Sequence, residues 1–507
     1  MREKLNKVWE LLTSKQKKDL LFFLFIAFFL SFLELLGIGL IIPFLMILTE
    51  NNYQDYLFMQ NFIDFFKIDS QKDLVIVFLL IIFFVFFTKN ILNVFFVFLK
   101  NKTFFQFFKD IEKKCMENYL KMPYKYFIKL NSSQLVNTLN SEIEYFVLGV
   151  LDPIVIICIE ALSIFAIFLV LFYVEPTGTI FLVLLTLFIF VIFYKLIGNK
   201  VKKIGTERLE LQNKVQKIVI QSLHGIKDIK IVNAEKNFLL NFYKKIDQLI
   251  NKQTKQKFFS DIPRYIIEVL VIFFLVILSL IILYQGKNVS ELLVIVGVFA
   301  GAGFRIMPSL NRLILATQSI KFSNSVIDLI HHDTFALKFQ NENLLNKKNK
   351  QTLKKIDKLE FQNVSFKYNE NEKFIFENIN LQISKNDFIG IYGESGAGKS
   401  TFVDILSGLL EPTSGKLVLN TNEDYKDIMN SGGEYIGYVP QNIYLNDESI
   451  CSNIALGENQ EDIDKSKINQ AIDRAKLRTF VDGLKDKENT IIAIARAIKI
   501  ITAIISA

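Results

Sequence analysis

Six long apolar runs restrict the fold of this chain more strongly than any other feature. They cover residues ~20–48, ~74–99, ~146–174, ~177–198, ~264–285 and ~291–316. A helix needs about twenty consecutive apolar residues to cross a bilayer, and each run meets or exceeds that length. So many long runs with few charges exclude a large soluble protein with buried helices. We therefore predict an α-helical membrane domain with six spans over residues 1–320.

Lysines are distributed unevenly between the segments that connect these runs. The polar stretches Lys100–Tyr145 and Asn199–Asp261 are rich in lysine, whereas the opposite loops carry only Lys67, Lys72 and Lys287. The positive-inside rule places both stretches and both termini in the cytoplasm. This placement accounts for the formal net charge of +8, so we expect no nucleic-acid partner. The three cysteines are far apart, which predicts neither a disulfide framework nor a zinc site.

The long polar stretches continue the helical pattern of the runs beside them. We expect helices that extend well beyond the bilayer and turn back near residues 126–132 and 221–227. The polar, lysine- and asparagine-rich residues 321–355 predict a linker. An alternating pattern typical of a strand begins at Leu359–Phe366, so residues 356–507 predict a second domain. The polar start of the chain and the length of the first run do not match a cleavable signal peptide.

A phosphate-binding loop lies in this second domain. The motif G-x-x-x-x-G-K-[ST] spans Gly393 to Ser400 in the run Gly393, Glu394, Ser395, Gly396, Ala397, Gly398, Lys399, Ser400 and Thr401. The preceding run Phe388–Tyr392 predicts a buried strand, and the following run Phe402–Leu406 predicts a helix. Backbone N–H groups of such a loop and the helix N-terminus bind phosphate. We predict that Lys399 reaches the β- and γ-phosphates of a nucleoside triphosphate and that Ser400 holds Mg²⁺; a glycine-rich turn without ligand is the alternative.

The order of these features resembles an ABC exporter half-transporter, in which a six-span membrane domain precedes an α/β nucleotide-binding domain. The resemblance implies that Tyr368 stacks on adenine and that Gln441, in the run Tyr438–Asn442, contacts Mg²⁺ and the attacking water. A core aromatic residue and an ordinary proline-containing turn are the respective alternatives. The resemblance also implies ATP and Mg²⁺ as cofactors, a homodimer, and a multi-pass location in the inner, cytoplasmic membrane of a bacterium.

Within this family the chain resembles the PglK-type flippases of lipid-linked oligosaccharides. The matching segments are Asp261–Arg264, Arg305–Arg312 and Ile436–Ile450. The resemblance implies an ATP-driven subunit that flips or exports a lipid-linked diphosphate oligosaccharide. Export of another lipid, a peptide or a toxin is the alternative.

Four cationic side chains in or beside the spans are candidate substrate ligands: Lys89, Arg264, Arg305 and Arg312. Guanidinium groups bind phosphate through paired hydrogen bonds, as a diphosphate headgroup requires. Arg305 and Arg312 are seven residues apart, which places them on one helix face roughly 10 Å apart. Pairing with Glu34, Glu160 or Glu268, or snorkelling to the membrane surface, explains these cations equally well. Pro308 between the two arginines predicts either a hinge or a static kink.

Three motifs of the family's catalytic cycle are not evident in the sequence. Lys485–Ile492 stands where the LSGGQ signature is expected, and Ala493–Ile498 resembles the segment after it. No acidic residue follows Glu488, so we expect no Walker B Asp-Glu pair, and the last histidine precedes the phosphate loop. Asn430–Glu434 resembles the signature but precedes Gln441 and predicts a turn. We expect a truncated or frame-disrupted half-transporter, or an incomplete gene model. Its incomplete nucleotide domain would bind ATP without normal hydrolysis, and a non-catalytic ATP-binding remnant is the alternative.

Overall fold

The structure is a computed structural model of the 507-residue chain. It describes residues 2–49, 57–66, 70–286, 289–336, 357–369, 373–420, 423–424, 436–441 and 443–492. The chain divides into two compact units, Met1–Lys348 and Asn349–Ala507, and each has hydrophobic cores of its own. Most of the predicted linker, the turn at Asn430–Glu434 and the segment Ala493–Ile498 lie outside the described residues.

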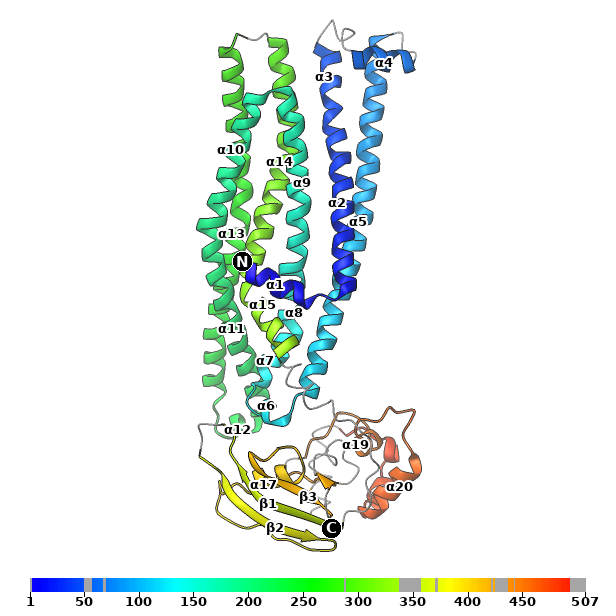
Figure 1. The fold of residues 1–507 in the computed structure, drawn as a ribbon, viewed down its shortest axis with the longest axis vertical. Helices are drawn as coiled ribbons and strands as arrows, with labels where there is room; N and C mark the ends of the chain where they lie inside the picture. Colours follow the sequence, from blue (N-terminus) through cyan, green and yellow to red (C-terminus); the bar gives the residue numbers. More distant parts are fainter. Residues whose placement is uncertain are drawn as a thin grey trace. The chain divides into compact units, whose positions relative to one another are not determined.

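The first unit is a bundle of long helices, as the apolar runs predict. Within the described residues, six helical segments are long and apolar enough to cross a membrane. They are Ser14–Leu48, Gln71–Lys121, Ser132–Val174, Pro176–His224, Glu235–Tyr284 and Glu291–Phe322. The principal helices in these segments are α2 (Ser14–Gly39), α3 (Ile41–Thr49), α5 (Gln71–Lys121), α9 (Asp152–Val174), α10 (Pro176–Ile192), α11 (Gly198–His224), α13 (Glu235–Tyr284) and α14 (Val289–Phe322). Figure 1 shows these helices, and α14 packs against α9, α11 and α13.

Several of these helices extend far past the thickness of a bilayer. Helix α5 has 51 residues and α13 has 50. At 1.5 Å per residue each is roughly 75 Å long, against a hydrocarbon core of about 30 Å. The chain turns back through α6 (Tyr124–Phe127) before α7 (Ser132–Asn137), and through α12 (Ile226–Ile231) after α11. The predicted extensions and both predicted turning points are therefore confirmed.

Shorter helices complete this unit. They are α1 (Arg2–Leu11), α4 (Leu57–Phe66), α8 (Ile143–Phe146) and α15 (Asn324–His331). A tight turn joins the third and fourth spans, with Glu175 extended and Pro176 opening α10. Proline suits the first position of a helix because its missing N–H would have no intrahelical partner there.

Four π-helical segments interrupt the regular helices in the described part of the first unit. They are η2 (Thr138–Glu142), η3 (Val147–Leu151), η4 (Phe193–Ile197) and η5 (His332–Ala336). Such segments often mark functional positions, because they change the hydrogen-bonding pattern of the backbone. Neighbouring side chains donate to carbonyl groups here: Ser319 to Gly149 at 3.2 Å and Lys321 to Tyr194 at 2.5 Å. These bonds fasten the end of α14 to the third and fourth spanning segments.

The second unit contains a small antiparallel sheet with strand order β2-β1-β3-β4. Its strands are β1 (Lys358–Phe366), β2 (Phe376–Ser384), β3 (Ser414–Leu419) and β4 (Glu423–Asp424), so the strand predicted from the alternating pattern is confirmed. Phe361 of β1 pairs with Leu381 on one side and Leu417 on the other. Helix α17 (Lys399–Leu406) follows the phosphate loop as predicted and stacks Phe402 on Phe361 at 4.9 Å.

A separate helical cluster follows the sheet. It consists of α19 (Ile450–Ile454), α20 (Lys465–Arg474), α21 (Arg478–Asp482) and η6 (Lys487–Asn489). The backbone N–H of Ile450 donates to Thr490 at 3.0 Å, and that of Ile492 donates to Glu448 at 2.8 Å. The residues that stand in place of the expected signature therefore form η6 and a short extended segment. This segment pairs with the backbone at the start of α19.

The prediction of a buried strand over Phe388–Tyr392 is wrong. These residues belong to no strand, and the side chains of Phe388 and Tyr392 are fully exposed. The physical reason is that an extended segment becomes a strand only when its backbone N–H and C=O groups pair with a neighbour. No strand of the described sheet lies beside this segment.

Candidate nucleotide and substrate sites

The phosphate loop has the backbone conformation that its glycines permit. Gly396 and Gly398 both have φ of +87°, in the left-handed region that disfavours residues with a Cβ. A Cβ on Gly398 would also lie 2.4 Å from Cγ2 of Ile375, so two independent constraints require glycine at the start of α17. A Cβ on Gly396 would meet no atom within 4 Å, which shows that the loop is open on that side.

The polar groups of the loop fit a bound phosphate chain. The Nζ atom of Lys399 donates to the carbonyl oxygens of Gly393 at 2.8 Å and Glu394 at 2.7 Å, so its ammonium group lies against the loop. Ser400 is exposed in the first turn of α17, where a hydroxyl can reach a metal ion beside phosphate. A nucleoside triphosphate requires an ammonium group, a hydroxyl and backbone N–H donors at a helix N-terminus. This loop offers all three beside a glycine-lined opening.

Tyr368 lies next to the phosphate-loop helix, although it is 33 residues from Thr401 in sequence. Its hydroxyl is 3.1 Å from the Thr401 hydroxyl, and its ring meets the edge of Phe366 at 5.0 Å. The side chain is half-buried, and its stacking on adenine stays a prediction. Gln441 is exposed, and no hydrogen bond in the described part of the chain joins it to the loop. Its contact with Mg²⁺ also stays a prediction.

Two of the predicted substrate cations share one carboxylate inside the membrane unit. Glu34 of α2 is 3.4 Å from Nζ of Lys89 on α5. Arg305 of α14 contacts both oxygens of the same carboxylate, with 2.8 Å between its Nη2 and Oε2 of Glu34. The Glu34 side chain is 3% exposed, whereas that of Arg305 is 29% exposed. The acid therefore lies behind the arginine.

A second pair repeats this arrangement with Arg312 and Glu160 of α9. Nε and Nη2 of Arg312 donate to the two carboxylate oxygens at 2.5 and 3.2 Å. The arginine side chain is 44% exposed and the glutamate 7%. Arg264 is also exposed and forms no ion pair among the described residues. The pairing with Glu34 and Glu160 that the sequence left open is thus present, and the role of all four cations in substrate binding stays a prediction.

Sequence reasoning missed two serines that contact each other, each one helical turn from one of these carboxylates. Ser31 lies one turn before Glu34, and Ser163 lies one turn after Glu160. Their hydroxyls are 3.3 Å apart and buried between α2 and α9. The signal was available, since Ser-x-x-Glu and Glu-x-x-Ser within apolar runs place hydroxyl and carboxylate on one helix face.

A fully buried ion pair in the first unit was also missed. Both oxygens of Glu142 in η2 accept hydrogen bonds from Arg208 of α11, at 2.8 and 2.7 Å, and neither side chain is exposed. The Asn137 amide donates to the same carboxylate at 3.1 Å, and the Tyr145 ring lies 4.0 Å from the guanidinium carbon. No local pattern marks this pair, because the two residues are 66 positions apart.

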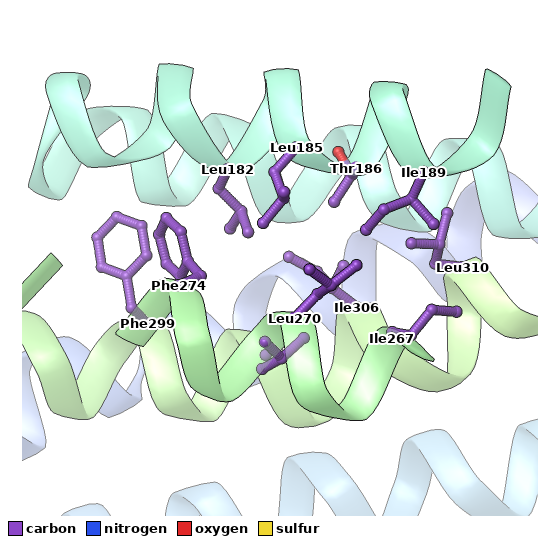
Figure 2. Close-up of a pocket in the computed structure, with 12 residues that line it drawn as sticks. Leu182, Leu185, Thr186, Ile189, Ile267, Leu270, Phe274, Phe299, Ile306 and Leu310 are labelled. Atoms are coloured by element: carbon purple, nitrogen blue, oxygen red, sulfur yellow. The ribbon is translucent and has the colours of Figure 1, made fainter. Parts of the chain in front are cut away.

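An apolar pocket lies between α10, α13 and α14, as Figure 2 shows. Its lining includes Leu182, Thr186, Ile267, Phe274 and Ile306, and none of its lining residues is charged. The predicted substrate cations do not line this pocket. The pocket therefore offers no group that could bind a phosphate.

Comparisons with known proteins agree with both halves of the chain. The family model described as the ABC transporter transmembrane region matches residues 20–300, more than half of the chain, and the ABC transporter model matches residues 376–499. The chain therefore belongs to the ABC transporter family. The second match implies that this chain binds ATP.

Individual relatives are more distant. An ATP-dependent lipid A-core flippase of Francisella tularensis is 21% identical over 399 residues, covering 77% of this chain and 63% of that protein. A lacticin-481/lactococcin-DR transport/processing ATP-binding protein of Lactococcus lactis is 27% identical, over 67% of this chain and 47% of that protein. The chain spans about half the length of the curated relatives that it matches.

A solved structure has the same fold. It is described as a bacterial Atm1-family ABC exporter with ATP bound, and it matches with a TM-score of 0.71 and 14% identity. The match covers 95% of this chain and 81% of that one. The chain is therefore a multi-pass membrane protein with the ABC exporter fold.

Proposed function

We propose that this chain is one half-subunit of a homodimeric, ATP-driven exporter in the inner membrane of a bacterium. The single observation that carries the proposal is a phosphate-binding loop encoded in the same chain as six membrane spans. The lysine-rich extensions and both termini lie in the cytoplasm in this proposal, as the positive-inside rule requires. ATP binding there would drive rearrangement of the membrane helices.

The residues of the loop define how ATP would be held. The backbone N–H groups of Gly393–Thr401 and the N-terminus of α17 bind the phosphates, and Lys399 neutralises their charge. Ser400 and Gln441 hold Mg²⁺, and Tyr368 stacks on the adenine. The metal supplies charge neutralisation on the phosphates when it is bound.

We further propose that the substrate is a lipid-linked oligosaccharide with a diphosphate group. Cations within membrane spans are costly and usually face a cavity with a function. The partial exposure of Arg305 and Arg312 supports this proposal, with Lys89 behind them and Arg264 at the start of the fifth span. A relative named as a lipid A-core flippase supports a lipid substrate. Another lipid, a peptide or a toxin is the alternative.

Photocrosslinking of 8-azido-ATP to the purified full chain in lipid nanodiscs tests nucleotide binding. We expect labelling of the wild type and at least tenfold weaker labelling of Lys399→Ala, because the variant loses a charge-assisted phosphate contact. Lys416→Ala is the matched control, since Lys416 is an exposed lysine on β3. Absence of labelling in a folded wild-type preparation would overturn the proposal.

A non-catalytic ATP-binding role is the second candidate. The segment Lys485–Ile492, which stands where the signature is expected, favours it. Phosphate release by the wild type, abolished by Lys399→Ala, would exclude this candidate. ATP labelling without phosphate release would support it.

Flipping of a fluorescent polyprenyl-diphosphate lipid in proteoliposomes tests the substrate. We expect Arg305→Ala to abolish transport, because it removes a phosphate-binding group from the membrane interior. Lys109→Ala, which removes an exposed lysine of α5, is the control and keeps its activity. Unchanged transport in Arg305→Ala would exclude this substrate site.

A further inference from the structure

Two carboxylates form ion pairs with the arginines that we propose as ligands of the substrate. Glu34 contacts Arg305 through both oxygens, and Glu160 contacts Arg312 in the same way. A carboxylate and a phosphate present similar paired oxygens to a guanidinium group. The two glutamates therefore accept hydrogen bonds from the same N–H groups that a diphosphate headgroup would use.

The glutamates of the two pairs are more deeply buried than the arginines. Glu34 and Glu160 are 3% and 7% exposed, whereas Arg305 and Arg312 are 29% and 44% exposed. Both arginines use Nε and Nη2 for the acids, and neither Nη1 has a hydrogen-bond partner among the described residues. A ligand can thus first contact the open edge of each guanidinium group and then compete with the acid for the other edge.

Charge adds a second constraint. Lys89, Arg305 and Arg312 oppose two carboxylates, which leaves one net positive charge in the cluster. A singly charged headgroup neutralises that excess but has no further charge with which to compete against the acids. A diphosphate brings more negative charge and more acceptor oxygens, so it can replace a carboxylate at an arginine.

We propose that Glu34 and Glu160 are specificity-determining residues: they act as internal competitors that admit multiply charged headgroups and reject singly charged or neutral ones. This inference rests on the proposed function, since it assumes that the arginines bind the substrate. The displaced Glu34 keeps a cationic partner in Lys89, 3.4 Å away. The carboxylate is therefore never left buried without a counter-charge, which would be strongly unfavourable.

Binding of three farnesyl compounds to the full chain in nanodiscs tests the inference. Farnesyl diphosphate, farnesyl monophosphate and farnesol share one tail and differ in the phosphate groups of the headgroup. The comparison is made at about pH 5, where the monophosphate is mostly singly charged. We expect Glu34→Gln and Glu160→Gln each to tighten monophosphate binding by about tenfold, a modest value for a close charge pair. Farnesol binding should stay unchanged. The double variant Glu34→Gln/Lys89→Met restores the original net charge and should bind the monophosphate less tightly than Glu34→Gln alone.

The sign of the effect separates this role from a purely structural one. If the acids only support the fold, their removal leaves buried cations without partners and weakens binding of all three compounds alike. Glu268→Gln is the control, because Glu268 lies in a spanning helix and forms no ion pair in the described part of the chain. Its affinities should match the wild type.

Failure of the inference can be told from failure of the proposed function. If the wild type binds farnesyl diphosphate no better than farnesol, the diphosphate substrate and the inference both fall. If the wild type prefers the diphosphate but neither glutamine variant binds the monophosphate more tightly, only the inference is overturned. Two independent single variants are used so that poor folding of one leaves the other informative.

Discussion

Two arginine–glutamate pairs in the first unit have the same chemistry and different surroundings. Arg208–Glu142 and Arg312–Glu160 are each joined by two hydrogen bonds between a guanidinium and a carboxylate. Neither member of the first pair is exposed, whereas Arg312 is 44% exposed. Burial therefore separates a structural brace from a pair that a ligand can reach, although the hydrogen bonds alone would not distinguish them.

Among the substitutions considered, we expect removal of the buried Arg208 side chain to destabilise the fold most. Arg208→Ala leaves the Glu142 carboxylate buried without its cation, which costs about 3–5 kcal/mol of folding free energy. Thermal unfolding of the detergent-solubilised chain measures the loss. Arg312→Ala is the comparison variant and should cost much less, because water reaches that site. Equal destabilisation by the two variants would contradict the distinction drawn from burial.

A substitution at the close contact between α11 and α14, near the Arg208–Glu142 pair, should cause the next largest loss of stability. A Cβ on Gly205 of α11 would lie 1.9 Å from the carbonyl oxygen of Phe322, which is backbone and cannot move aside alone. We expect Gly205→Ala to destabilise the chain by about 1–3 kcal/mol in the same assay. Gly301→Ala is the control, since its Cβ would meet Ile41 at an ordinary 3.6 Å. Equal melting temperatures for the two variants would refute this account of the α11–α14 contact.

An exposed ion-pair cluster gives the smallest effect. Burial raises the pKa of Asp328, but hydrogen bonds from Lys4 and Lys7 outweigh it and hold the pKa below its ordinary value of 3.8. A carboxyl group with a lowered pKa stabilises the fold above its ordinary pKa, and this contribution is lost as pH falls through the lower value. We therefore expect α1 to loosen from α15 only below about pH 4.

The chain contains one tryptophan, Trp9 of α1, which makes this transition measurable. Its fluorescence should shift as the pH falls below about 4, and salt should weaken the contact because Asp328 is 49% exposed. Asp328→Asn should show a smaller pH dependence, since the Glu10–His331 ion pair also joins α1 to α15. An identical titration in the variant would assign the shift to another group.

The success of sequence reasoning depended on how local each feature is. The phosphate loop was predicted correctly as a loop followed by a helix, because Gly396 and Gly398 permit the backbone conformation within the motif itself. The strand at Phe388–Tyr392 was predicted wrongly, because a strand depends on partners elsewhere in the chain. Hydrophobicity indicated that these residues could be buried, but it could not supply a neighbouring strand.

The same limit applies to the candidate site in the membrane. The sequence identified Arg305, Arg312 and their possible acidic partners, since charges stand out in apolar runs. It could not choose between pairing and substrate binding. The structure gives each arginine a carboxylate and also leaves part of it exposed, so the two interpretations are compatible.

The sequence by itself determined the six spans, the long helical extensions, the phosphate loop and the ABC family resemblance, because these follow from the length, composition and spacing of neighbouring residues. The tertiary structure alone decided which acid meets which cation and which pair is sealed from solvent. Partners such as Glu142 and Arg208 are 66 positions apart, and their meeting depends on how separate helices pack. Helix packing is set by side-chain shape across the whole bundle, which no local pattern encodes.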